Sequence, residues 1–225
     1  MYKILENSIV QINSFKDIND DLIKKLHDEL KLDTLVFLPK NPLFSDIQAL
    51  NTNISKSYFT QLGFTASTKD IKKISDNTSK EFQIINLESS TANKHIEDSY
   101  SSSFALKWKD YIGSELNAEN INFLKNSSNS TIFIKSTKTN KNSGTAISFP
   151  AKYCTGESLE QIGWVWIDNS LEKDDRIKIK NIITHWIAAK DKSLLQAGVH
   201  LYNKSSQQFF KSIGFKPTCA HIRKI

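Results

Sequence analysis

The C-terminal end of the chain constrains most strongly what the sequence can fold into. Apolar side chains predict a buried strand over Leu194–Tyr202, and Asn203 follows at the end of that strand. The helical spacing of apolar residues then predicts a short helix over Ser205–Ser212. Gly214 ends this helix, because glycine readily takes the left-handed backbone conformation that terminates helices, and Phe215 starts a last strand. This order of elements is typical of α/β proteins.

The residues at this end resemble the closing motif of the GNAT superfamily of N-acetyltransferases, N-x-x-A-x-x-(L/F)-Y-x-x-x-G-F. The matching positions hold Asn203, Ser206, Phe209, Phe210, Gly214 and Phe215. The resemblance implies an N-acetyltransferase for which acetyl-CoA is the co-substrate. It also implies that the acceptor is an amine, carried by a small molecule or a peptide.

The resemblance extends to the order of the predicted elements, because from Glu81 onward strands and helices follow one another as they do in GNAT proteins. These elements are predicted over Glu81–Leu87, Thr91–Lys125 (a helical region broken near Gly113), Ser130–Lys135, Gly144–Pro150, Gln161–Ile167, Asp175–Ala189, Leu194–Tyr202, Ser205–Ser212 and Phe215–Ile222. The polar segment Thr65–Lys80 precedes them and marks a domain boundary. We therefore expect an α/β (α+β) fold, a GNAT-like mixed sheet with flanking helices, in an acyltransferase domain over residues 80–225.

Residues 1–79 are predicted to form a smaller α/β region with the same order of elements. The predictions are a strand over Asn7–Asn13, a helix over Asp17–Leu32, a strand over Thr34–Leu38 and a helix over Ser55–Leu62. Gly63 then ends the helix as Gly214 ends the C-terminal one, and Phe59 corresponds to Phe210. We interpret the region as a truncated second copy of the GNAT half-fold. The alternative is coincidence, because glycine is a frequent helix stop.

Composition and charge exclude several other classes of protein. The net charge of +6 at pH 7 comes from lysines and arginines spread along the chain, so we expect a solvated surface and no nucleic-acid partner. The two cysteines, Cys154 and Cys219, belong to no CxxC or His/Cys cluster, so we expect reduced thiols and no metal site. No apolar run is long enough to cross a bilayer, and we expect a cytoplasmic protein without a membrane partner.

The resemblance places acetyl-CoA in a cleft where two neighbouring parallel strands diverge. These strands would be Gln161–Ile167 and Leu194–Tyr202. Backbone N–H groups on the first strand would orient the acetyl carbonyl and the pantetheine arm. The residues that carry them are Val165, Trp166 and Ile167. Trp164 shares a strand face with Trp166, and the two indoles either wall an acceptor pocket or fill the core.

The loop that binds the pyrophosphate in GNAT enzymes, (Q/R)-x-x-G-x-(G/A), has lost its glycines here. Its counterpart consists of Arg176, Ile177, Lys178, Ile179, Lys180 and Asn181. Ile179 and Asn181 stand at the small positions, where a Cβ crowds the diphosphate. Asp174 and Asp175 add negative charge, although the nearby cations and the positive end of a helix still attract phosphate. The alternative is that the basic run is a solvated start of a helix.

Glu160, His200 and Tyr202 are the candidate catalytic groups. Glu160 is interpreted as a base acting through water or as an exposed carboxylate at the edge of the sheet. His200 is interpreted as a general base or as a hydrogen-bonded core residue. Phe210 stands at the position of the tyrosine acid of many GNAT enzymes, and a phenyl ring cannot donate a proton. Tyr202, Tyr153 and Cys219 are the side chains that can replace it. Asn203 would contact the pantetheine arm or cap the last helix.

These residues leave two functions open, and a third, a basic nucleic-acid-associated module, would need a contiguous Lys/Arg stripe with exposed aromatic side chains. The first is a GNAT N-acetyltransferase that transfers an acetyl or other acyl group from CoA to an amine. The second is a non-catalytic GNAT-like domain with a degenerate CoA site, which binds a protein or another ligand. The missing glycines and Phe210 favour the second function, and the closing motif is compatible with both.

Overall fold

The computed structural model describes residues 2–5, 8–71, 80–101, 114–126 and 129–224. The chain divides into two compact units, and each unit gathers segments that are distant in the sequence. Unit 1 contains Met1–Asp70, Lys152–Leu159 and Leu194–Ile225, and unit 2 contains Ile71–Ala151 and Glu160–Ser193. The predicted division into residues 1–79 and 80–225 does not coincide with these units, and it stays a prediction about separately folding domains.

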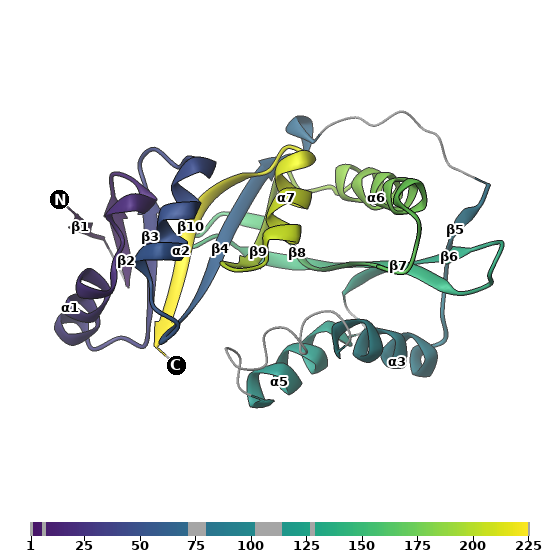
Figure 1. Ribbon diagram of the computed structural model, residues 1–225, viewed down its shortest axis with the longest axis horizontal. Helices are drawn as coiled ribbons and strands as arrows, with labels where there is room; N and C mark the ends of the chain where they lie inside the picture. The colour runs from purple at the N-terminus through teal and green to yellow at the C-terminus, as the bar shows by residue number, and fades with distance from the viewer. Residues whose placement is uncertain (1, 6–7, 72–79, 102–113, 127–128, 225) are drawn as a thin grey trace. The chain divides into compact units, whose positions relative to one another are not determined.

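Unit 1 contains a mixed sheet with strand order β1-β2-β3-β10-β4-β9 (Figure 1). Its strands are β1 (Lys3–Ile4), β2 (Ile9–Ile12), β3 (Thr34–Pro39), β4 (Tyr58–Ser67), β9 (Leu194–His200) and β10 (Lys216–Lys224). β2 and β3 pair in parallel, whereas the other pairs of neighbouring strands are antiparallel. The C-terminal strand β10 therefore lies between two strands of the N-terminal region.

Side-chain hydrogen bonds cap the starts of several helices in unit 1. They are η1 (Phe15–Asp17), α1 (Asp20–Leu30), η2 (Phe44–Asp46), α2 (Ile47–Asn53), η3 (Thr68–Asp70) and α7 (Lys204–Ser212). Asn19 caps α1 by accepting a hydrogen bond of 2.9 Å from the Leu22 N–H, and Lys31 ends it in the left-handed conformation. Ile23 and Leu26 are the buried side chains of α1. The amphipathic helix is thus anchored by its apolar face, as expected for a short helix.

The predicted helix over Ser55–Leu62 is wrong, because this segment leads into strand β4 and α2 lies earlier in the chain. Buried side chains alternate along β4, and they belong to Thr60, Leu62, Phe64 and Ala66. This period of two is the signature of a strand. Gly63 is a glycine because β10 approaches closely, since a Cβ there would lie 2.3 Å from the Cys219 Sγ. It therefore marks a close contact inside the sheet and not the end of a helix.

The element order nevertheless agrees with the interpretation of two copies. The run β2-α1-β3-α2-β4 has the same order as β8-α6-β9-α7-β10. In the sheet, β10 lies between β3 and β4, while β4 lies between β10 and β9. The last strand of each copy therefore lies between the final two strands of the other copy. The predicted correspondence of Gly63 with Gly214 is wrong, because Gly63 lies within a strand and Gly214 follows α7.

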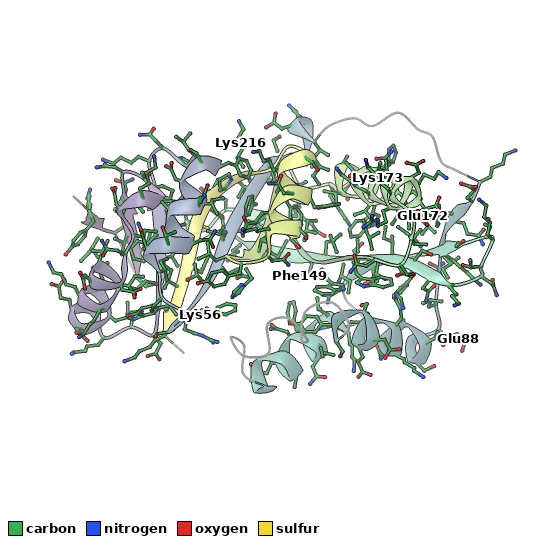
Figure 2. The ribbon with its side chains drawn as sticks, viewed as in Figure 1. Lys56, Glu88, Phe149, Glu172, Lys173 and Lys216 are labelled. Atoms are coloured by element: carbon green, nitrogen blue, oxygen red, sulfur yellow. The ribbon has the colours of Figure 1, made fainter. Side chains whose placement is uncertain are left out.

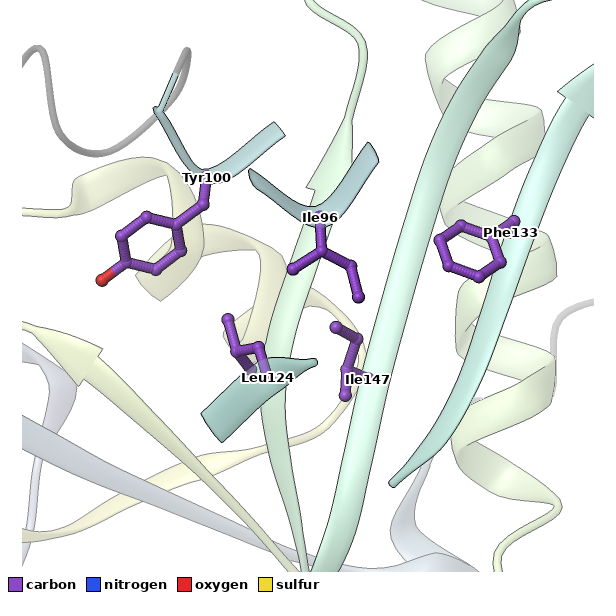
Figure 3. Packing of buried hydrophobic residues seen from close by; sticks show 5 residues of the cluster. All are labelled: Ile96, Tyr100, Leu124, Phe133 and Ile147. Carbon is purple, nitrogen blue, oxygen red and sulfur yellow. The ribbon is translucent and has the colours of Figure 1, made fainter. Parts of the chain in front are cut away.

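Unit 2 contains the strand order β8-β7-β6-β5, and its described residues also form the helices α3, α5 and α6. The elements are β5 (Phe82–Ile85), α3 (Ser89–Tyr100), α5 (Ser114–Leu124), β6 (Ser130–Ser136), β7 (Asn142–Lys152), β8 (Ser158–Ile167) and α6 (Lys173–Ala188). β5 pairs with β6, and β6 with β7, in antiparallel fashion. One cluster of buried side chains joins the two helices α3 and α5 to the sheet (Figure 3). Its members are Ile96, Tyr100, Leu124, Phe133 and Ile147.

The predicted α/β (α+β) class, a mixed sheet with flanking helices, is confirmed, and from β5 to β10 the elements follow the predicted order of strand, helices, three strands, helix, strand, helix, strand. The helical region predicted over Thr91–Lys125 contains α3 and α5. Its predicted break near Gly113 lies outside the described residues. Among the described residues, no helix combines the length and apolar character needed to cross a bilayer.

Candidate functional site

The start of α6 follows closely after the end of β8 within unit 2. Between them, the Asp168 carboxylate accepts hydrogen bonds from the Ser170 N–H (2.9 Å) and Oγ (2.8 Å), which form a tight turn. Glu172, labelled beside Lys173 in Figure 2, is the N-cap residue of α6. Its side chain makes no capping hydrogen bond. The Arg176 N–H donates to the Glu172 carbonyl at 3.0 Å. The N–H groups of the first turn, from Lys173 onward, come before this first hydrogen bond of the helix and point along its axis. N–H groups in this arrangement bind anions.

The residues predicted to form the pyrophosphate loop lie inside α6. Arg176, Ile177, Lys178, Ile179, Lys180 and Asn181 all belong to the helix. Their N–H groups are therefore used by the hydrogen bonds of the helix itself. The Ile179 side chain is fully buried, and a Cβ at Gly144 of β7 would lie 2.6 Å from its Cγ2, so Ile179 packs against the sheet. The binding role of these residues stays a prediction.

The first two residues of α6, Lys173 and Asp174, lie ahead of the predicted start of this helix at Asp175. Glu172 carried the available signal, since a residue with a carboxylate directly before Lys173 can occupy the N-cap. Acidic residues can either precede a helix or belong to its first turn, so the sequence does not fix the residue at which α6 starts.

An ion-pair cluster surrounds Lys178 on the first turns of α6. Its ammonium group contacts the Glu81 carboxylate and lies 2.9 Å from Asp175 Oδ1. Lys138 also pairs with Glu81. Hydrogen bonds from Lys138 and Lys178 lower the pKa of Glu81 to about 2, and the hydrogen bonds of Lys178 to Glu81 and Asp175 raise the pKa of Lys178. Asp175 is therefore neutralised by a partner, so its charge opposes an anion at the helix start less than an unpaired carboxylate would.

Glu160 is buried, with 8% of its surface exposed, so the interpretation as an exposed edge carboxylate is wrong. The Ser148 hydroxyl donates to Glu160 Oε1 at 2.5 Å, and Lys190 Nζ lies 3.9 Å from the same oxygen. Lys190 also donates to Ser130 Oγ at 2.8 Å and lies 3.5 Å from the centre of the Trp186 ring. Burial lowers the pKa of Lys190. Glu160 thus belongs to a polar network of unit 2, and its role as a base stays a prediction.

His200 and Tyr202 lie together at the end of β9 in unit 1. The Tyr202 N–H donates to His200 Nδ1 at 3.3 Å, which places the ring proton on Nε2. The His200 ring lies 5.1 Å from that of Phe59 and 5.5 Å from that of Tyr202. Burial lowers the pKa of His200 to about 4, so the imidazole is neutral at pH 7. These contacts support the core interpretation, while the catalytic roles of both residues stay predictions.

Asn203 and Phe210 have structural partners in the same unit. The Asn203 side chain accepts a hydrogen bond of 3.1 Å from the Ser206 N–H and caps α7, as one of the two interpretations holds. Phe210 is buried, and its ring lies 5.1 Å from the rings of both Phe209 and Phe215. Phe210 is therefore a core side chain of this region. A contact of either residue with CoA stays a prediction.

The tryptophans of β8 pack against α3 in unit 2. The Trp164 indole donates to Ser99 Oγ at 3.3 Å and lies 4.8 Å from the Tyr100 ring. Trp166 lies 5.3 Å from the His95 ring in an edge-on contact. These contacts support the core interpretation of both indoles. The donor role of Val165, Trp166 and Ile167 stays a prediction. So does the divergence of β8 from β9, because these strands belong mainly to different units.

The structure thus distributes the predicted site residues over both units. Unit 1 holds His200, Tyr202, Asn203 and Phe210, and unit 2 holds Glu160, Val165, Trp166, Ile167 and the residues from Arg176 to Asn181. Among the described residues, no group of histidine, cysteine, aspartate and glutamate side chains has the arrangement of a metal site.

Comparison with known proteins gives likenesses of structure only. No protein-family model matches the chain, and no curated protein sequence matches it. A conserved protein of unknown function from Bacteroides thetaiotaomicron is 9% identical with a TM-score of 0.50, over 97% of this chain and 80% of the other. A tandem GNAT protein from the clavulanic acid biosynthesis pathway (9% identity, TM-score 0.45, 97% and 76%) and a GCN5-related N-acetyltransferase from Kribbella flavida (9%, 0.46, 91% and 73%) are also similar. The first likeness shows a shared fold and nothing about activity.

Proposed function

We propose that the protein is a GNAT-like acyltransferase that transfers an acyl group from acetyl-CoA to an amine of a small molecule or a peptide. The observation that carries the proposal is the first turn of α6, which has no side-chain cap and directly follows β8. In the fold that this chain resembles, the same strand–turn–helix unit holds the thioester cofactor. The order of elements on both sides of this unit supports the assignment.

The residues at the helix start fit a diphosphate in part. The N–H groups of Lys173, Asp174 and Asp175 would receive the phosphate oxygens, helped by the positive end of the helix dipole. Side-chain charges add little attraction, because residues 172–178 contain Glu172, Asp174 and Asp175 against Lys173, Arg176 and Lys178. We therefore expect hydrogen bonds, and not net charge, to hold the diphosphate. The affinity should be weaker than that of a glycine-rich loop, which lets the backbone approach more closely.

Acyl transfer in this site would depend on positioning. The backbone N–H groups of Val165–Ile167 would polarise the thioester carbonyl as charge develops on its oxygen. His200, with its pKa lowered to about 4, is a poor match for a proton from an amine whose own pKa is about 10. The productive substrate is then the small fraction of amine that is already neutral. Accordingly, the rate of transfer should rise through the neutral and alkaline range without a plateau near pH 6.5.

No tyrosine stands at the family position from which the leaving thiolate would be protonated. Phe210 stands there and is packed into the aromatic core, so it cannot supply a proton. A thiol with a pKa of about 8.5 leaves as a thiolate without assistance more easily than an alcohol does. Tyr202 remains the candidate donor from the sequence, and Tyr202→Phe should lower turnover without changing acetyl-CoA affinity if it has this role.

A non-catalytic binding domain is the second candidate. The burial of Phe210 and of Ile179, at positions where GNAT enzymes place a proton donor and a glycine, favours it. Under this function the intact chain binds CoA or another acyl ligand without releasing a thiol in the presence of amines.

One experiment separates the two candidates. The intact chain is titrated with acetyl-CoA by calorimetry and is then incubated with acetyl-CoA and a panel of primary amines while free thiol is measured. Saturable binding together with amine-dependent thiol release supports the acyltransferase. Binding without release supports the second candidate. Absence of heat at millimolar acetyl-CoA, with an unchanged melting temperature, contradicts both forms of the CoA site.

A further inference from the structure

Strand β5 forms one edge of the sheet in unit 2. It comes last in the strand order, so within the described part of the chain β6 is the only strand that pairs with it (Figure 1). Its two central residues, Gln83 and Ile84, are exposed, and Ile84 is 52% exposed although its side chain is apolar. An exposed edge strand can pair with a strand of another chain. β5 is thus a candidate interaction surface, and it has no part in the proposed acyl transfer.

The main chain of β5 directs hydrogen-bonding groups to this open edge. The Thr137 N–H donates to the Glu81 carbonyl at 2.8 Å, which continues the register of β5 with β6, so the Glu81 carbonyl points to β6. The direction of the N–H and carbonyl groups alternates along a strand. Those of Phe82 and Ile84 therefore point away from β6, and a further strand can pair with β5 through these two residues.

The sequence of β5 does not protect the edge against pairing. Proteins usually protect edge strands by making them very short or by placing lysine, another charged residue or proline on them. Phe82–Ile85 contains neither a charged residue nor a proline. Strand β1, at the other end of the strand order, differs because it has only two residues and one of them is Lys3. The unprotected edge of β5 is therefore the one that a partner strand would cover.

The charges on either side of β5 favour a second copy of the same strand as the partner. Lys80 precedes the strand and Glu88 follows it, and both are exposed. The Glu88 side chain, labelled in Figure 2, makes no capping hydrogen bond to α3. If two copies of β5 pair antiparallel with Ile84 opposite Ile84, Lys80 of each copy faces Glu88 of the other. Registers centred on Gln83 or Ile85 lose both of these pairs, so the charges select the register.

We propose that the protein forms a dimer in which two copies of β5 pair antiparallel, with Ile84 opposite Ile84. This pairing uses the outward N–H and carbonyl groups of Phe82 and Ile84. It also places the two exposed Ile84 side chains side by side on one face of the joined sheet, where they cover each other. The Lys80–Glu88 pairs hold the register at both ends. A four-residue strand covers little surface, so we expect the dimer to dissociate on dilution.

Sedimentation velocity of the intact chain over a range of concentrations tests the dimer. Ile84→Lys places two like charges opposite each other and should leave the chain monomeric at concentrations where the unaltered chain is dimeric. Leu43→Lys is the matched control, because Leu43 is 55% exposed and belongs to unit 1, and it should leave the dimer intact. An unaltered chain that stays monomeric up to millimolar concentration overturns the proposal. So does a dimer that survives Ile84→Lys or is lost in Leu43→Lys.

Charge reversal tests the register. Glu88→Lys places a lysine opposite Lys80 at both ends of the paired strands and should weaken the dimer by roughly 5- to 30-fold. Lys80→Glu, at a residue outside any helix, should weaken it to a similar extent. The double variant Lys80→Glu/Glu88→Lys restores opposite charges at both ends and should recover the dissociation constant of the unaltered chain. A double variant that stays as weak as the single variants overturns the proposed pairing.

Hydrogen exchange of the unaltered chain decides if a variant melts at a much lower temperature. The N–H groups of Phe82 and Ile84 point to the open edge in the monomer and are hydrogen-bonded in the proposed dimer. Their exchange with solvent should therefore slow as the concentration of the chain rises. Exchange at both residues that does not depend on concentration overturns the proposal.

Discussion

Replacing Lys173 with proline removes one N–H group from the start of α6 and leaves the helix in place. Lys173 is the first helical residue, and proline is favoured at that position because its fixed φ suits the helix and its missing N–H has no partner within it. The preceding residue, Glu172, has φ −59° and ψ 155°, the extended conformation that a residue before proline prefers. Lys173→Pro therefore removes one backbone hydrogen-bond donor, together with the lysine charge, from a helix that stays intact.

The expected magnitude follows from the chemistry of the lost bond. A hydrogen bond to a charged group contributes about 1.5–3 kcal/mol, so acetyl-CoA affinity should fall by roughly 10- to 150-fold. Proline also removes the lysine charge, and Lys173→Ala is the matched control because it loses the charge and keeps the N–H. An exposed charge contributes about 0–1 kcal/mol, so the alanine variant should lose at most about fivefold.

Calorimetric titration of both variants with acetyl-CoA measures the difference, and far-ultraviolet circular dichroism with thermal melting checks that the helix persists. The reasoning predicts that the proline variant binds much more weakly than the alanine variant at equal stability. Equal affinities in two equally folded variants would refute the use of the first-turn N–H groups as phosphate ligands.

Three further predictions concern the packing and ionisation of named side chains. Ile179→Ala should lower the free energy of unfolding by about 2–5 kcal/mol, because Ile179 is fully buried. Ile177 is 46% exposed, so Ile177→Ala should change this free energy by less than about 0.5 kcal/mol. Urea denaturation measures both values, and equal effects would contradict the placement of Ile179 in the core. Gly63→Ala should destabilise the fold by about 1–3 kcal/mol through contact with the Cys219 sulfur. Cys219→Ala in the same chain should recover part of that loss, and strictly additive effects in a double-mutant cycle would disprove the steric cause. His200 has a pKa of about 4 in the folded chain, below its unfolded value of about 6.5, so the unfolded state binds its proton first as the pH falls. The neutral ring therefore contributes about 3 kcal/mol to the free energy of unfolding above pH 6.5, and this contribution is lost as the pH falls to 4. In His200→Gln the free energy of unfolding should depend less on pH between 6.5 and 4. The same pH dependence in the variant and in the unaltered chain would contradict this assignment.

Much of the fold could be predicted from the sequence because most elements carry strong local patterns. The strands β3, β6, β8 and β9 and the helices α1, α6 and α7 coincide with the predicted segments to within a few residues. The error over Ser55–Leu62 arose because a Leu-Gly-Phe sequence is read as a helix stop when the neighbouring strand is not known. In the structure, Gly63 is explained by the sulfur of Cys219, a residue far away in the chain. The sequence cannot show such a contact directly.

The same limit applies to the candidate site. The exchange of β4 and β10 between the two copies depends on long-range pairing, which no local pattern encodes. Burial of Glu160 depends on Ser148 and Lys190, one from a neighbouring strand and one from beyond the helix. By contrast, Asn203 could be read as a cap, because its partner Ser206 is local.

NMR of the intact chain tests most directly whether acetyl-CoA binds at the start of α6 and along β8. The amide resonances are followed while acetyl-CoA is added. The account predicts saturable shifts concentrated at the N–H groups of Lys173–Asp175 and Val165–Ile167, with the fully buried interior of α6 around Ile183 unchanged. Saturable shifts that spare both segments, or no shifts at millimolar acetyl-CoA, would contradict it.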